Sequence, residues 1–105
     1  MDFAFSPEHR ALRRMIREFV ENEVAPIAAE IDRTHRVPLE TMRKLSEVGL
    51  LGVCFPQEYG GMGAGEIGYC ILMEELNRVC ASTCTNVGAH IGIGAMAIYL
   101  DGNEE

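Results

Sequence analysis

The 105-residue sequence has no tryptophan, and it has one long interval without charge. No aspartate, glutamate, lysine or arginine occurs between positions 79 and 100, although 24% of the whole chain is charged. A helix that is apolar on every side must be wrapped by other elements or lie in a membrane. The apolar part here is shorter than the roughly 20 residues of a membrane span, and polar residues precede it. We therefore expect a central buried helix over Ser82–Leu100, in a soluble bundle.

Signals for export, metal binding and nucleic-acid binding are also missing. The first nine residues lack the basic region and apolar run of a secretory signal, so we expect a cytoplasmic protein, or a mitochondrial matrix protein if a leader has been removed. None of the four cysteines forms a Cys-x-x-Cys pair. They are expected to be reduced and buried, with a redox or metal role as the alternative. The net charge of −7 argues against a nucleic-acid partner.

Hydrophobic periodicity predicts an all-α fold, a bundle of four to five helices with one Gly-rich loop and no clear strand. Ser6 suits a helix cap and Pro7 a first helical position. Pro26 removes a backbone donor, but the apolar stripe keeps its phase, so we expect a kink between Asn22 and Pro26 and no break. The stretch 50–55 could run extended. The expected helices cover residues 6–33, 38–49, 66–79 and 82–100.

The same pattern predicts the direction of side chains on the last two helices. In the third helix Ile67 is expected to face inward, while Glu74, Glu75 and Arg78 are expected to face solvent. In the fourth helix Ser82 is the expected cap. His90 is expected to be a buried neutral imidazole, with a place beside a ligand as the alternative.

Glycines gather in the loop 60–65 and in the fourth helix. The loop lacks the preceding strand and following lysine of a phosphate-binding loop, so a tight or flexible connection is expected. Gly88, Gly92 and Gly94 each cost a helix about 1 kcal/mol relative to alanine. A close helix neighbour or a ligand is expected to use the space that their missing side chains leave.

Several short stretches occur together in the order and spacing of a known family. They are Leu12–Phe19, Val24–Pro26, Glu30–Arg33, Leu45–Gly52, Pro56–Gly61, Met73–Leu76, Cys80–Thr83 and Gly102–Glu105. In combination they resemble the amino-terminal helical domain of the acyl-CoA dehydrogenases. The segment Gly88–His90, taken with the Gly-Asn-Glu run near the end, is most similar to the isovaleryl-CoA dehydrogenase branch.

The resemblance implies an FAD-dependent enzyme that oxidises acyl-CoA to 2,3-enoyl-CoA and passes electrons to an electron-transfer flavoprotein. It implies a homo-oligomer without a membrane span. Thr85, Asn86 and Ala89 align with residues that line the acyl chain. Residues 1–105 would be the amino-terminal domain, without the central β-domain and the C-terminal helical domain that supply the catalytic glutamate and most flavin contacts.

The 105 residues alone are therefore expected to contain no catalytic and no cofactor-binding residue. We expect this chain by itself to be inactive, to hold FAD poorly and to self-associate through uncovered apolar surface, with helix exchange as one route. The alternative is a stand-alone helical module that serves assembly or lipid binding without catalysis.

Overall fold

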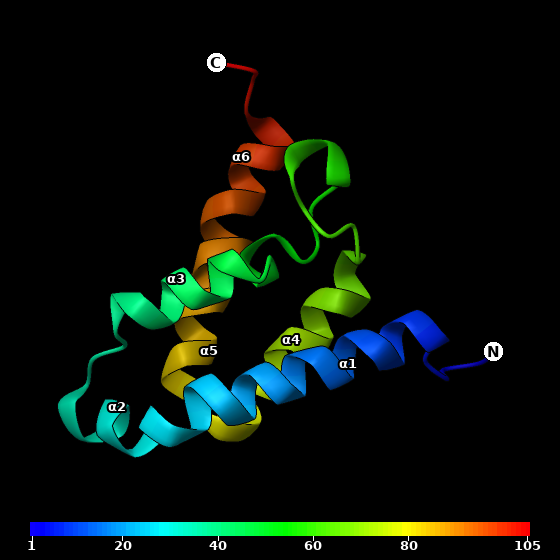
Figure 1. Cartoon of the computed structure of the whole chain (residues 1–105). Helices are drawn as coiled ribbons and strands as arrows, with labels where there is room; N and C mark the ends of the chain where they lie inside the picture. The colour runs from blue at the N-terminus through cyan, green and yellow to red at the C-terminus, as the bar shows by residue number, and fades with distance from the viewer.

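The structure, a computed structural model, describes residues 1–105. Helices account for all of its regular secondary structure (Figure 1). The all-α expectation is confirmed, because no strand occurs. The segments are α1 Pro7–Phe19, the π-helical η1 Val20–Val24, the 3₁₀ turn η2 Ala25–Ile27, α2 Ala28–Thr34, α3 Leu39–Glu47, the 3₁₀ turns η3 Leu50–Gly52 and η4 Gln57–Tyr59, α4 Gly65–Val79, α5 Ala81–Gly88, the π-helical η5 Ala89–Ala95 and α6 Met96–Asp101.

Two long helical columns organise the molecule. The first runs through α1 and α2, and α4 packs against it. The second runs through α5, η5 and α6, and rises from this base to the C-terminus (Figure 1). The two columns meet through α4, which contacts both α1 and α5. No helix is both long enough and apolar enough to cross a bilayer.

The first column begins and bends as the sequence predicts. The Ser6 hydroxyl accepts a hydrogen bond from the backbone N–H of His9 at 3.1 Å, and the His9 Nδ1 accepts one from the Ser6 N–H at 3.4 Å. Before Pro26 the chain widens into the π-helical η1 and then tightens into η2, so the helix bends and continues. His35 closes α2 in the left-handed conformation with φ of 58°.

One apolar cluster forms the core between the two columns and η3. Apolar residues of the predicted helices supply most of it. Ile67, which was expected to face inward, is exposed, as are Leu39 and Val48 of the second predicted helix. The stretch 50–55, which could have been extended, forms 3₁₀ and other turns. The core side chains are Ile16, Val20, Val24, Ile31, Leu45, Leu50, Val53, Ile71, Leu72, Leu76, Cys80, Val87 and Ile91.

The Gly-rich loop is a tight connection folded back on η3. The N–H groups of Gly61, Met62, Gly63 and Ala64 donate to the carbonyls of earlier residues between positions 52 and 56 at 2.8–3.0 Å. A Cβ on Gly61 would lie 2.1 Å from the Phe55 carbonyl oxygen, so only glycine allows this approach. With its amide groups already bonded, the loop offers no cradle for a phosphate.

The expectation that Glu75 faces solvent is wrong. Its side chain is 1% exposed, and its carboxylate accepts hydrogen bonds from Arg13 at 2.9 Å and from Arg17 at 2.9 and 3.0 Å. Arg78 lies 3.5 Å away on the same helix. These cations hold the pKa of the Glu75 carboxyl below its usual value, chiefly through the Arg17 hydrogen bond. Glu75 therefore ties α4 to α1, while Glu74 and Arg78 are exposed as predicted.

The second column is not wrapped on every side, which corrects the first expectation from the sequence. His90 is exposed, and Ile93, Ile98 and Leu100 are 77%, 71% and 67% exposed. The main elements against it are α4 and η3, and Phe55 and Tyr59 reach Tyr99 near its end, so more than one side stays open. The cap of this column lies two residues earlier than expected, because Cys80 and not Ser82 occupies it.

The cysteines are all free, and they differ in burial. Cys80 is buried, Cys54 and Cys84 are half-buried, and Cys70 is exposed, so the expectation of four buried thiols is wrong for Cys70. Burial raises the pKa of the Cys54 and Cys84 thiols, which keeps them protonated near neutral pH. No group of three histidine, cysteine or acidic side chains is placed to hold a metal ion.

Candidate functional site

The residues that the family resemblance assigns to the acyl chain lie together on the outer side of the second column. Thr85 and Asn86 are in α5, and Ala89 begins η5. All three are exposed. Thr85 and Ala89 are four residues apart, so they share one face. We call the surface of Thr85, Asn86 and Ala89 the outer face.

The outer face is small and uncharged. The Thr85 hydroxyl donates to the Ala81 carbonyl at 2.9 Å, so its proton is already used within the helix. Ala89 presents only a methyl group. No charged residue occurs anywhere between positions 79 and 100. This surface carries no charge and offers no acid, base or nucleophile placed for chemistry.

The opposite side of the same helix fixes the outer face in place. Thr83, Val87 and Ile91 are fully buried, and they point into the core. The Thr83 hydroxyl donates to the Cys80 Sγ at 3.1 Å, which satisfies the buried polar group. Because one side of the helix is held by the core, the side with Thr85 and Ala89 is turned outward.

Side chains of a neighbouring helix pack against two of the three glycines in the second column. A Cβ on Gly88 would lie 3.3 Å from the Met73 Sδ and 3.5 Å from the Tyr69 Oη. A Cβ on Gly92 would lie 3.2 Å from the same Tyr69 Oη. The expected close helix neighbour is therefore α4. Gly94 meets nothing nearer than the Ala89 carbonyl oxygen at 3.7 Å, so packing does not explain it.

Tyr69 is the site residue that sequence reasoning missed. It is half-buried on α4, and desolvation is the main reason that the pKa of its phenol is raised. The available signal was the spacing of Gly88 and Gly92 by four residues, which marks a notch on one helix face. A large side chain of a neighbouring helix had to fill that notch.

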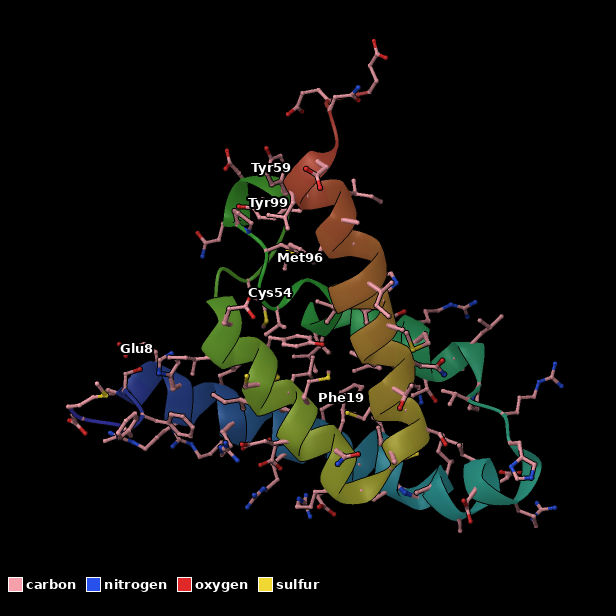
Figure 2. All side chains as sticks on the ribbon, turned by 180° about the vertical axis from the view of Figure 1, so that it is seen from behind. Glu8, Phe19, Cys54, Tyr59, Met96 and Tyr99 are labelled. Carbon is pink, nitrogen blue, oxygen red and sulfur yellow. The ribbon has the colours of Figure 1, made fainter.

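Apart from the outer face, a hollow of about 370 Å³ opens between the Gly-rich loop and α6. Its aromatic wall consists of Phe55, Tyr59 and Tyr99, whose rings pack edge to face with centroids 5.7 and 6.1 Å apart. Figure 2 shows Tyr99 of α6 beside Tyr59 of η4. Thr85, Asn86 and Ala89 do not line this hollow. Nearby acidic groups, Glu104 first, raise the pKa of the Tyr59 phenol.

The residues of this chain do not fit a complete flavin dinucleotide. Such a cofactor carries a diphosphate, which proteins bind with cationic side chains or free backbone N–H groups. The hollow has no lysine or arginine in its lining, and Glu104 contributes a negative charge. The N–H groups of the loop beside it already donate to carbonyls.

Comparison with known proteins identifies the family. The model of the acyl-CoA dehydrogenase N-terminal domain matches residues 6–105. The match covers nearly the whole chain, so the chain belongs to the acyl-CoA dehydrogenase family and represents its N-terminal domain.

Individual relatives match the chain as well. The short-chain specific acyl-CoA dehydrogenase of Clostridium acetobutylicum is 46% identical over all 105 residues, which correspond to 28% of its length. The mitochondrial short-chain specific acyl-CoA dehydrogenase of Bos taurus is 44% identical over 75 residues, 71% of this chain and 18% of that protein. The acryloyl-CoA reductase (NADH) of Anaerotignum propionicum is 37% identical over the whole chain and 26% of its own length. The chain thus spans 18–28% of the length of these relatives.

A solved structure has the same fold. It comes from work on the electron transferring flavoprotein of Acidaminococcus fermentans and flavin-based electron bifurcation. The two chains superpose with a TM-score of 0.93 at 36% identity, over 99% of this chain and 27% of the other. The isovaleryl-CoA branch remains a prediction, because the relatives described above carry other substrate names.

Proposed function

We propose that this chain is the amino-terminal domain of an FAD-dependent acyl-CoA dehydrogenase, and that its outer face forms part of the acyl-chain pocket. The observation that carries the proposal is the exposed, uncharged surface of Thr85, Asn86 and Ala89, held outward by a buried opposite side. Family membership supplies the reaction class. Small side chains at Thr85 and Ala89 leave room for an alkyl chain, whose burial against them would remove apolar surface from water.

The proposed reaction is the oxidation of an acyl-CoA thioester to the 2,3-enoyl-CoA. A glutamate removes the α-proton, and the β-hydrogen leaves as a hydride to the flavin, whose electrons pass on to an electron-transfer flavoprotein. We assign the base and the flavin contacts to parts of the protein other than these 105 residues, because no residue here is placed for either role. The chain on its own is then inactive and holds FAD poorly. We further propose that the full protein is a homo-oligomer, located in the cytoplasm or the mitochondrial matrix.

The first test uses the full protein that contains this chain. Purified protein should be yellow, and a series of acyl-CoA thioesters should reduce an artificial electron acceptor in its presence. A colourless protein that reduces no acceptor with any acyl-CoA would contradict the proposal. It would favour the alternative of a helical module for assembly or lipid binding.

The second test concerns the outer face itself. Ala89→Leu adds three carbons where the acyl chain is proposed to lie, so kcat/KM should fall by about tenfold or more, in line with the usual effect of small steric changes in a hydrophobic pocket. Ala97→Leu makes the same change at an exposed position of α6 outside the outer face and should leave kcat/KM within about twofold. Equal effects of the two substitutions would argue against the assigned face.

A further inference from the structure

A tyrosine from α4 fills the only notch next to the outer face. Gly88 and Gly92 lack side chains on the side of the helix that faces α4, and the Tyr69 hydroxyl lies against both of them. Along a helix axis the two glycines are separated by about 6 Å. Without the tyrosine ring, a gap would open between α4 and η5 at this place.

The notch adjoins the proposed acyl pocket on the side of Thr85. Thr85 lies three residues before Gly88 in the α-helical α5, so the two positions are neighbours on the helix surface. Gly88 in turn faces the Tyr69 hydroxyl. Any extension of the pocket from Thr85 towards α4 therefore meets the Tyr69 ring first.

A second side chain of α4 meets the same notch. The Met73 Sδ lies 3.3 Å from the position of a Cβ on Gly88. Cys84 contacts Met73, with 3.7 Å between the two sulfur atoms, and its thiol donates to the Met73 carbonyl at 3.4 Å. Tyr69 and Met73, four residues apart on α4, thus fill the notch at Gly88 together.

We propose that Tyr69 is a specificity-determining residue that closes the acyl pocket at the Gly88–Gly92 notch and restricts the enzyme to short acyl-CoA thioesters. The inference rests on the proposed function. It adds to it a substrate class and the side chain responsible for that class.

The test is a chain-length profile of the full enzyme, measured as kcat/KM for butyryl-CoA and octanoyl-CoA. The wild type should prefer butyryl-CoA. Tyr69→Ala should raise the ratio of octanoyl-CoA to butyryl-CoA activity by about tenfold or more, because it opens the notch. Tyr69→Phe keeps the ring and should keep the wild-type ratio within about threefold. Tyr99→Ala, an equal truncation in the other hollow, should also leave the ratio unchanged.

The outcomes separate this inference from the proposed function. A wild-type enzyme that reduces no acceptor with any acyl-CoA would overturn both. An active enzyme that prefers octanoyl-CoA, or a Tyr69→Ala variant with the wild-type ratio, would overturn the role of Tyr69 alone. Should Tyr69→Ala fail to fold, Tyr69→Leu shortens the side chain while it keeps an apolar group against the notch. It should then shift the ratio in the same direction, and an unchanged ratio would contradict the proposal.

Discussion

At the scale of single residues, the buried Glu75 carboxylate is the most consequential group in the chain. It is surrounded by Arg13, Arg17 and Arg78, and it is the charged side chain with the least exposure. Losing one member of a buried ion cluster costs more than losing an exposed pair, because the remaining charges stay partly desolvated.

Glu75→Gln should therefore lower the free energy of unfolding by about 3 kcal/mol. This value is at the low end for buried ion pairs, because the Arg17 side chain is 54% exposed and solvent screens part of its interaction with Glu75. The matched control is Glu40→Gln, which removes an exposed partner of Arg43 and should cost less than about 0.5 kcal/mol. Urea unfolding followed by circular dichroism measures both, and similar values for the two variants would contradict the assigned role.

The same carboxylate predicts a pH dependence. The pKa of Glu75 in the folded chain lies below its usual value of 4.5, so folding favours the ionised form. Its contribution to stability is complete above pH 4.5 and is lost as the pH falls through the lower folded-state pKa. The melting temperature of the wild type should therefore fall more steeply below about pH 4.5 than that of Glu75→Gln. Parallel curves would argue against the coupling.

Sequence reasoning failed at this residue for a physical reason. Glu74 and Glu75 were treated alike because both are charged. Glu75 lies four residues after Ile71 and three after Leu72, within the buried side of α4, and this spacing was the overlooked signal. A buried glutamate carboxylate needs hydrogen-bonding cations, and here Arg13 and Arg17 supply them from a distant segment of the chain. Periodicity within one helix does not reveal such partners.

At the scale of elements, helix existence and order followed from the sequence, while helix type did not. Local signals such as Ser6-Pro7 and Pro26 predicted the start of α1 and its bend correctly. The π-helical segments η1 and η5 were not expected, because a wider turn depends on how a helix packs against its neighbours. The outer face came from family resemblance, and the residue that fills its adjoining notch, Tyr69, required the packing of α4 against α5.

Gly94 and Gly61 predict opposite outcomes of the same substitution. Gly94→Ala meets no close neighbour and should stabilise the chain by about 0.5–1 kcal/mol through higher helix propensity. Gly61→Ala places a Cβ against the Phe55 carbonyl oxygen and should destabilise it by more than about 1 kcal/mol. Thermal unfolding of the two variants tests the pair, and a loss of stability in Gly94→Ala would show that its glycine has a role that packing does not reveal.

At the scale of the whole molecule, the second column carries an uncovered apolar surface. Ile93 and Leu100 are seven residues apart on this column and both are largely exposed. Apolar surface of this kind favours association.

The isolated chain should therefore self-associate in a concentration-dependent manner, measured by sedimentation velocity. The double substitution Ile93→Lys and Leu100→Lys should shift the chain towards the monomer. Leu39→Lys, at an exposed apolar position on α3, should not. A wild-type chain that stays monomeric at every concentration would contradict this expectation.

The π-helical η5 holds one residue more than an α-helical turn of the same column would need. Deletion of one residue between Ala89 and Ala95 would restore α-helical winding and rotate everything beyond it by about 100° about the helix axis. Tyr99 would then swing away from Phe55 and Tyr59, and the hollow at the loop would lose a wall, while Val87 upstream kept its place in the core. The extra residue thus fixes the rotation of α6 about the helix axis. With this rotation, the first half of the column faces α4 and the second half faces the Gly-rich loop.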